Sequence, residues 1–391
     1  MSDIVIAGAK RTAIGSFLGQ FTGVPTPELG AIAIKAALEQ SGVGAADVTE
    51  VIMGCVLPAN LGQAPARQAS LKAGLPTSAG ATTINKVCGS GMKAIMLAHD
   101  LIKAGSASVV VAGGMESMTN APHMVNARTG IRYGDGQLVD HMAWDGLTNP
   151  YDGQSMGVFG EKCADKYHFT REAQDAYAIA SVERAKAAQA AAAFANEIVP
   201  VTVQGRKGPQ DFVEDEQPGR SDTAKIPTLR AAFRKENGTI TAASSSSISD
   251  GAAALVLMSA DDAKAKGAKP LARIVAHATH SQEPEWFTTA PVGAIQKVLD
   301  KAGWKVGEVD LFEVNEAFAV VPMAVMHELG VGHDKLNVNG GACALGHPIG
   351  ASGARIVVTL LNALTVRGAK RGVASLCIGG GEATAIAIEL V

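Results

Sequence analysis

The chain has 391 residues, a length that favours two or three packed units over one small domain. Hydrophobic residues make up 47% of the chain and charged residues 18%, which allows a large core and excludes a mainly disordered protein. The net charge of -3 arises from 34 basic and 37 acidic residues. A broad cationic surface is therefore absent, and nucleic acids are poor candidate partners.

The cysteine count and the apolar runs bear on location. Five cysteines cannot all pair, and a chain of this length needs no disulfide, so we expect free thiols in a reducing compartment. The first residues, Met-Ser-Asp-Ile-Val-Ile-Ala, do not form a basic segment followed by a long apolar one, as a secretory signal would. No apolar run reaches the roughly 18 residues of a membrane span. We therefore expect a cytoplasmic protein without a membrane segment.

The first third of the chain alternates strands and helices. A β-branched run at 4–7 predicts a short strand, and the alanine-rich stretch 27–40 predicts a helix that ends at Ser41-Gly42. The short apolar runs at 51–53 and 108–112 are typical of buried central strands. These elements indicate an α/β fold.

The middle of the chain has a different composition. Residues 120–248 contain Asp/Gly/Pro-rich pieces and polar stretches around one long helix, which we expect from an N-cap at Thr170 to about Asn196. Residues 249–258 are then expected to return to the first unit through a helix start and a buried strand. We interpret 120–248 as an inserted cap or loop domain.

The C-terminal third repeats features of the first third in the same order, at slowly rising offsets. Residues 38–48 match 299–309, residues 87–91 match 349–353, and residues 109–116 match 375–382. Collinear matches of this kind favour a duplicated α/β half over chance. We predict one half at 1–119 plus 249–269, the cap at 120–248, and the second half at 270–391.

Cys88 is a candidate nucleophile. It lies in Asn85-Lys86-Val87-Cys88-Gly89-Ser90-Gly91, just before a predicted helix at 92–103. Free amides at a helix start stabilise a thiolate, so we expect a lowered pKa for this thiol, and the flanking glycines would let a substrate carbonyl approach those amides. The alternative is a small buried cysteine, which is the commoner fate of a free thiol.

Two more residues could serve such a thiol. His347 lies in the glycine-rich run 340–353 ahead of a helix, where it has room to act as a base, although a histidine bonded to a loop carbonyl would look the same. Cys377 ends a strand before Gly379-Gly380-Gly381, at the position where the repeat has Val111. A chemical role and a buried, valine-sized thiol explain that cysteine equally well.

A third motif follows the apolar run 309–314. Asn315-Glu316-Ala317-Phe318 would lie at the carboxyl end of a strand, where α/β sheets gather ligand-binding groups, unless Asn315 and Glu316 only cap a helix. The five cysteines fit no zinc-binding pattern. No dinucleotide or P-loop fingerprint is completed either, so we expect neither a metal site nor a phosphate-binding loop.

At these residues the chain resembles the thiolase family, most closely its short-chain biosynthetic type, the acetyl-CoA acetyltransferases. Four separated motifs, at 85–92, 315–318, 346–353 and 377–381, follow the family's order, and the resemblance covers essentially the whole chain. It implies the thiolase fold, with two duplicated α/β halves packed together and an inserted cap. It also implies an acyltransferase that condenses two acetyl-CoA into acetoacetyl-CoA and CoA, reversibly, through an acyl-cysteine.

The resemblance assigns a role to each motif residue. Cys88 would be the nucleophile, His347 its base, and Cys377 the acid/base that takes the α-proton or activates the incoming CoA thiol. His347 and a water held by Asn315 would bind the enolate oxygen. The amides of Cys88 and Gly379 would bind the oxygen of the acylated thioester. No metal and no tightly bound cofactor is implied; coenzyme A thioesters are the substrates.

The resemblance also suggests substrate contacts and assembly. Ser246 would contact pantetheine, and Arg220, in a slipped register, lies near the family's adenine contact. A short acyl pocket would be lined by Leu147, Met156, Ala317 and Phe318. The partners implied are acetyl-CoA, acetoacetyl-CoA and CoA, with copies of the chain forming a homodimer or homotetramer.

The chain also departs from the family pattern. Ser155 replaces a histidine, Ser244 replaces an asparagine, residues 287–291 replace a Gly/Met-rich loop, and Glu382 follows the triple glycine. These differences bear on acyl-chain preference and CoA contacts. One alternative is a degradative 3-ketoacyl-CoA thiolase with longer substrates. The other is a non-catalytic acyl-CoA or lipid carrier, which would need neither Cys88 nor Cys377.

Overall fold

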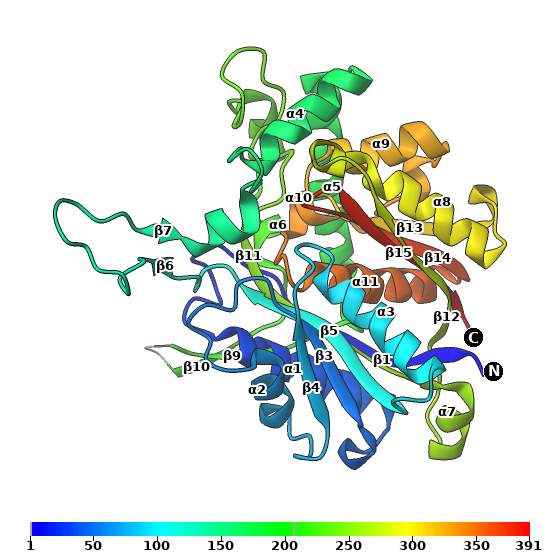
Figure 1. Cartoon of the computed structure of the whole chain (residues 1–391). Coiled ribbons are helices and arrows are strands. Elements are labelled where there is room, and N and C mark those ends of the chain that lie inside the picture. The colour runs from blue at the N-terminus through cyan, green and yellow to red at the C-terminus, as the bar shows by residue number, and fades with distance from the viewer. Residues whose placement is uncertain (1, 206–207) are drawn as a thin grey trace.

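The computed structural model describes residues 2–205 and 208–391, and a large mixed β-sheet runs through its centre (Figure 1). The strands follow the order β13-β14-β15-β12-β1-β11-β5-β3-β4, with β2 beside β11 and β8 beside β1. The sheet consists of β1 (Ile4–Thr12), β2 (Gly15–Ser16), β3 (Glu50–Gly54), β4 (Gly80–Ile84), β5 (Val109–Ser117), β8 (Ile198–Val199), β11 (Ser249–Ser259), β12 (Ala272–Ser281), β13 (Leu311–Val314), β14 (Arg371–Ile378) and β15 (Glu382–Leu390). The predicted α/β class is confirmed.

The sheet has two parts with a narrow junction. β12 and β1 pair only through Val5 with Arg273 and Ile6 with Ala272. On either side of that junction the pairing is long: β11 runs antiparallel to β5 from Asp250 to Met258, and β12 runs antiparallel to β15 over most of its length. The residues of the first third thus lie on one side of the junction and those of the last third on the other.

Helices cover both parts of the sheet. α3 (Ser90–Lys103) and α11 (Ser352–Arg367) share one hydrophobic core with strands from both parts, whereas α1 (Thr26–Ser41) and α8 (Ala290–Ala302) each pack in a core of their own part (Figure 1). The remaining helical segments outside residues 120–248 are α2 (Pro65–Lys72), α7 (Ala260–Lys266), α9 (Val320–Leu329), α10 (Ala342–Leu345), and the short segments η1 (Ala45–Asp47), η4 (Pro284–Thr289), η5 (Val306–Glu308) and η6 (His333–Lys335).

The middle region carries two helices and several short elements. These are β6 (His123–Met124), β7 (Val139–Asp140), η2 (Met142–Leu147), α4 (Met156–Tyr167), α5 (Arg171–Ala190), β9 (Val201–Gly205), β10 (Gly208–Phe212), α6 (Glu216–Arg220) and η3 (Thr223–Thr228). The Thr170 hydroxyl accepts a hydrogen bond from the Ala173 N–H, which confirms the predicted N-cap of α5. The helix ends earlier than predicted, because the chain turns at Ala192 and places Phe194 in a buried cluster.

Two other boundaries differ from the sequence-based expectation. Residues 249–258 contain no helix start; β11 begins at Ser249 and stays buried to Met258 between β5 and β1. β5 continues past Ala112 through Gly113, where a Cβ would lie 2.0 Å from the Ala253 carbonyl oxygen. Because glycine has no Cβ, β11 can come close to β5 at this position, and the strand continues beyond it. Among the described residues, no helix has the length and apolar character needed to cross a bilayer.

A buried ion cluster joins β1 to the middle region. The Arg11 guanidinium donates to Glu197 at 2.6 Å and to both carboxylate oxygens of Asp215, at 2.7 and 2.9 Å. All three side chains are almost completely buried. Asp215 also accepts from the Ile14 N–H at 2.8 Å. Because buried charges must be compensated, this cluster fixes where Glu197 and Asp215 lie against the sheet.

Removing one member of this cluster should therefore destabilise the protein strongly. We expect Asp215→Ala to lower the free energy of unfolding by about 3–5 kcal/mol, because the Arg11 charge would stay buried without a full partner. Chemical denaturation followed by circular dichroism measures the change. Glu28→Ala, which removes the exposed ion pair with Lys72, is the matched control and should cost at most about 1 kcal/mol. Equal losses in both variants would contradict the proposed role of the cluster.

Candidate active site

A cavity of about 490 Å³ lies where the middle region meets both parts of the sheet. Its wall contains eight of the eleven residues predicted for the site: Cys88, Leu147, Met156, Ser246, Ala317, Phe318, His347 and Gly379. Asn315 and Cys377 are buried but are not part of its wall, and Arg220 lies outside it. Segments far apart in the sequence therefore meet at one cavity.

The loop that carries Cys88 is fixed by its own residues. It connects β4 to α3, and Val87 adopts a left-handed conformation with φ of 47°. The Ser90 hydroxyl accepts from the Lys86 N–H at 2.8 Å and donates to the Val87 carbonyl at 2.7 Å. A Cβ on Gly89 would lie 2.3 Å from Cδ1 of Ile378, so glycine is needed for the close approach of this loop to β14. The result is a braced turn that presents Cys88.

The electrostatics of Cys88 differ from the sequence-based expectation. Burial raises the pKa of its thiol to about 11, and the N–H groups of Gly379 and of Cys88 itself, which hydrogen-bond the sulfur, only partly oppose that rise. The prediction of a lowered pKa is wrong because desolvation outweighs the amides at the helix start. Cys88 thus rests as a thiol, and a base must remove its proton before it can act as a nucleophile.

His347, the predicted base, lies on the same cavity wall as Cys88. Its Nδ1 lies 2.5 Å from the Ser352 hydroxyl oxygen, and that hydroxyl donates its single proton to the Pro348 carbonyl at 2.9 Å. Nδ1 must therefore carry the proton and donate, which leaves a lone pair on Nε2. Nε2 is buried and has no hydrogen-bond partner among the described residues. The imidazole is thus bonded to a side-chain hydroxyl and not to the loop carbonyl of the alternative interpretation.

The charge state of His347 follows from its surroundings. Burial and, to a smaller extent, the positive charge of Arg355 lower its pKa to about 3. The imidazole therefore stays neutral at physiological pH and can accept a proton through Nε2. Thiol and imidazole are thus both neutral at rest on the wall of one cavity, since burial disfavours the charged form of each.

Asn315 and Cys377 lie behind the cavity wall. Asn315 follows β13, its Oδ1 lies 3.5 Å from Nη2 of Arg355, and its buried Nδ2 has no partner among the described residues. Arg355 is itself held by Glu313 at 2.8 Å. Cys377 is fully buried near the end of β14, where burial and the neighbouring Cys88 raise the pKa of its thiol well above the usual range. The second thiol thus lies near the first, and Asn315 keeps a free amide donor.

The turn after Cys377 depends on glycine. Gly380 and Gly381 have φ of 95° and 87°, and a Cβ on Gly381 would lie 2.3 Å from the Gln282 carbonyl oxygen. Directly after this turn Glu382 pairs with Lys86, two residues before Cys88, and accepts from the Ser281 hydroxyl at 3.0 Å. The glutamate that departs from the family pattern therefore ties the turn with Gly379 to the loop with Cys88.

The predicted CoA contacts fall into two groups. Ser246 lines the cavity and donates its N–H to the Ala317 carbonyl at 3.0 Å, and Phe318 packs edge-on against Phe233. Arg220 is 57% exposed and pairs with Glu216 on the outer side of α6. The structure thus brings together the predicted pantetheine and acyl contacts but leaves the predicted adenine contact at the surface.

The positions that depart from the family pattern are also separated. Ser155 and Phe287 line the cavity, so these two differences reach the space in which a substrate would bind. Ser244 is buried away from the cavity and accepts from the Thr241 N–H at 2.9 Å.

Sequence reasoning missed several residues that support the site. Glu116 is completely buried and accepts from the N–H groups of Val56, Leu57 and Gly350, and so anchors the loop with His347. Burial raises the pKa of Glu116 to about 7, although these hydrogen bonds oppose the shift. A charged residue at the end of an apolar strand was the one available signal. Ser352 lay within a recognised motif, but its contact with His347 exists only in the folded chain.

The chain is similar to known proteins over its whole length. Residues 4–261 match the family model "Thiolase, N-terminal domain", and residues 268–390 match "Thiolase, C-terminal domain". The chain is 52% identical to Acetyl-CoA acetyltransferase 2 of Arabidopsis thaliana, with 100% of this chain and 97% of that protein covered. It is 53% identical to an acetyl-CoA acetyltransferase of Chromobacterium violaceum, with 99% of each covered.

A solved structure is similar over the whole chain. The Acat5 thiolase of Ascaris suum in complex with coenzyme A aligns with a TM-score of 0.95 and 44% identity, covering 100% of both chains. The chain belongs to the thiolase family. The predicted thiolase fold and the predicted class of acyltransferase enzyme are thereby confirmed.

The contact between His347 and Ser352 leads to a test. We expect Ser352→Ala to slow acetylation of Cys88 by acetyl-CoA at least about tenfold, because Nδ1 loses the acceptor that keeps the lone pair on Nε2. Rapid quench followed by mass spectrometry measures the single-turnover rate, and substrate affinity should change little. Ser70→Ala, at a buried serine of α2, is the matched control. An unchanged rate in Ser352→Ala would remove Ser352 from the mechanism.

Proposed function

We propose that this chain catalyses the reversible condensation of two acetyl-CoA molecules to acetoacetyl-CoA and CoA, as an acetyl-CoA C-acetyltransferase. The observation that carries the proposal is one cavity wall that holds Cys88, His347 and the Gly379 amide, with Cys377 close behind it. The names of the full-length relatives, at about half identity, support the same activity.

In the first half-reaction Cys88 would become acetylated. Nε2 of His347 takes the thiol proton, and the sulfur attacks the carbonyl carbon of acetyl-CoA. The developing oxyanion accepts from the N–H groups of Cys88 and Gly379, which already point at the sulfur in the resting site. The C–S bond to CoA breaks, the leaving thiolate takes the proton of Cys377, and CoA departs as a thiol. The site then holds an acetyl-cysteine, an imidazolium and a Cys377 thiolate.

In the second half-reaction the Cys377 thiolate and the His347 imidazolium would act on the second substrate. The Cys377 thiolate takes the α-proton of a second acetyl-CoA, and the enolate oxygen accepts from the His347 imidazolium and from a water held by Nδ2 of Asn315. The enolate carbon attacks the acetyl group, Cys88 leaves as a thiolate, and the imidazolium returns its proton. Thiolysis runs the same steps in reverse, with Cys377 activating the CoA thiol. No step requires a metal or a redox cofactor.

Substrate binding is proposed on the cavity and on the relative from Ascaris suum, whose structure contains coenzyme A. Ser246 would contact the pantetheine arm, and Leu147, Met156, Ala317 and Phe318 would enclose a short acyl group, since all of them line the cavity. Arg220, one turn of α6 beyond the cavity-lining Gln217, would contact the adenine end of CoA at the surface.

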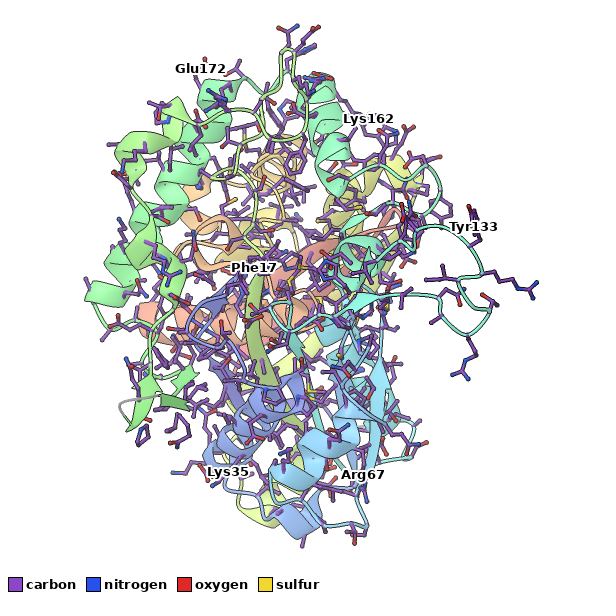
Figure 2. All side chains as sticks on the ribbon, turned by 90° about the vertical axis from the view of Figure 1, so that its left-hand side faces the viewer. Phe17, Lys35, Arg67, Tyr133, Lys162 and Glu172 are labelled. Carbon is purple, nitrogen blue, oxygen red and sulfur yellow. The ribbon has the colours of Figure 1, made fainter. Side chains whose placement is uncertain are left out.

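We also propose the organisation of the chain and its assembly. The halves are 1–119 plus 249–269 and 270–391, with the cap at 120–248; the narrow junction between β1 and β12 supports this division. A homo-oligomer is supported by an arm of the cap whose apolar side chains, including Ile131, Tyr133 and Leu138, lie exposed (Figure 2). The five free thiols support a cytoplasmic location.

The two thiols should be separable by reaction step. We expect Cys88→Ser to lose the acetyl adduct on incubation with acetyl-CoA, because no carboxylate-oriented histidine is arranged to activate a serine there. We expect Cys377→Ser to keep the adduct but to lose turnover by about 10²-fold or more, because a hydroxyl is far less readily ionised than a thiol. Mass spectrometry of the adduct and steady-state rates measure the two effects.

The matched control for these variants is Cys163→Ser, at a buried cysteine outside the cavity wall, which should keep both adduct and turnover. An adduct confined to Cys377 would reverse the two assignments. Near wild-type turnover of Cys377→Ser would leave that residue as a core thiol and require another proton carrier. Binding of acetyl-CoA with neither adduct nor turnover in the wild-type protein would favour the acyl-CoA carrier.

Chain-length preference should distinguish the biosynthetic type from a degradative one. We expect kcat/KM for thiolysis of acetoacetyl-CoA to exceed that for 3-ketooctanoyl-CoA at least about tenfold, because Met156, Leu147 and Phe318 enclose the space around the acyl group. Spectrophotometric loss of the 3-ketoacyl enolate measures both rates. Met156→Ala should lower the ratio of the two kcat/KM values, because the smaller side chain leaves more space for a longer acyl group. A ratio near one in the wild-type protein would instead support a degradative 3-ketoacyl-CoA thiolase.

A further inference from the structure

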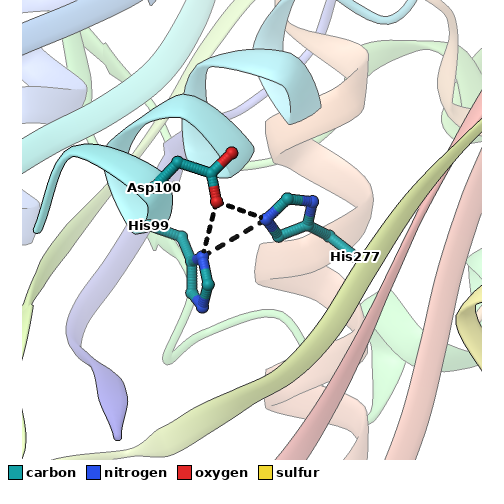
Figure 3. A group of neighbouring side chains, drawn as sticks. All are labelled: His99, Asp100 and His277. Atoms are coloured by element: carbon teal, nitrogen blue, oxygen red, sulfur yellow. Dashed lines mark hydrogen bonds and ion pairs between the residues drawn. The ribbon is translucent and has the colours of Figure 1, made fainter. Parts of the chain in front are cut away.

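Three polar side chains converge at a place that the proposed reaction does not use. His99 and Asp100 lie near the C-terminal end of α3, and His277 reaches them from β12 (Figure 3). Nδ1 of His99 lies 3.0 Å from Oδ1 of Asp100, Nε2 of His277 lies 2.9 Å from the same oxygen, and the two nitrogens are 3.2 Å apart. Three potential ligand atoms from two elements thus meet at one point.

Hydrogen bonding alone makes at most two of the three contacts. A neutral imidazole carries one N–H, so if both nitrogens donate to Asp100, no hydrogen bond joins the two nitrogens at 3.2 Å. If His99 instead accepts from His277 through Nδ1, its lone pair faces the carboxylate oxygen at 3.0 Å. A cation that accepts a lone pair from each atom would use all three.

The spacing also fits a metal ion. Two ligands bound at about 2.1 Å lie roughly 3.0 Å apart at right angles and roughly 3.4 Å apart at the tetrahedral angle that is common for Zn²⁺. The observed separations of 2.9, 3.0 and 3.2 Å lie close to the first of these values. The atoms therefore have the spacing of three adjacent ligands on one face of a coordination sphere.

We propose that Nδ1 of His99, Oδ1 of Asp100 and Nε2 of His277 bind a divalent transition-metal ion such as Zn²⁺ or Co²⁺. Two imidazoles and one carboxylate suit this class of ion better than Mg²⁺ or Ca²⁺, which prefer oxygen ligands. The Asp100 side chain is 54% exposed and both histidines 15%, so solvent can supply the remaining ligands.

The surrounding charges bear on the affinity. Asp100 supplies one negative charge, and Lys301, whose Nζ donates to the His277 carbonyl at 3.0 Å, opposes it with a positive one. We therefore expect moderate, micromolar binding and not the tight binding of a structural zinc site with several thiolates.

The position of the site assigns it a structural role. His99 lies nine residues after the start of α3, or about 14 Å along the helix from the loop that carries Cys88, so the ion would not touch the reacting atoms. The ion would join α3, which follows β4 of one part of the sheet, to β12 of the other part. The junction between these two parts is narrow. Binding to the folded state alone would raise thermal stability as the metal concentration rises.

Metal titration of the tag-free, chelator-treated full chain tests the proposal. We expect Co²⁺ to bind with one-to-one stoichiometry and to give visible d–d absorption without an intense thiolate charge-transfer band, and Zn²⁺ to displace it. Asp100→Asn, at a mostly exposed position, and His277→Gln should each weaken Co²⁺ binding at least tenfold. His327→Gln, at an exposed histidine of α9, is the matched control and should leave binding unchanged.

A Cys88→Ser background separates this site from the reactive thiol and should retain the same binding. Zn²⁺ should raise the thermal midpoint of the wild-type protein but not that of Asp100→Asn. The proposal would be overturned if no saturable binding occurred, if Asp100→Asn bound as tightly as the wild-type chain, or if binding disappeared with Cys88.

Discussion

Desolvation of Cys88 and His347 is the constraint on which the site depends. Burial raises the pKa of the thiol to about 11 and lowers that of the imidazole to about 3, so both groups rest uncharged in the same cavity. Charge separates only when the proton moves between them, and backbone N–H groups are already in place for the anion that results. The rest of the structure has to hold the thiol, the imidazole and the N–H groups in place at the cavity.

Close backbone contact brings the catalytic loops into one place. A Cβ on Gly91 would lie 2.7 Å from the Ala354 nitrogen, and a Cβ on Gly353 would lie 2.4 Å from the Met92 nitrogen. These two glycines match in the internal repeat, so the starts of α3 and α11 approach each other through equivalent positions. Any side chain there would push apart the loops with Cys88 and His347.

Charged side chains then hold in place the loops that these glycines allow to approach each other. Glu116 accepts from Gly350 and so anchors the turn behind His347, and Arg355 contacts Oδ1 of Asn315 and so leaves its amide nitrogen free. Lys86 and Glu382 join the loop of the nucleophile to the glycine turn of β15. Each of these contacts acts through another residue, and the charged partners Glu116, Arg355 and Glu382 lie outside the four motifs.

The sequence by itself determined the α/β class, the Thr170 cap and eight residues of the cavity wall, because these depend on local pattern, on short motifs and on their order. It did not determine the direction of the Cys88 pKa shift, since desolvation comes from side chains distant in the chain. The proton position on His347 and the orientation of Asn315 likewise depend on neighbours that only folding supplies. The meeting of His99 with His277 is the clearest case, because a helix and a strand from different thirds of the chain must pack before three ligand atoms can converge.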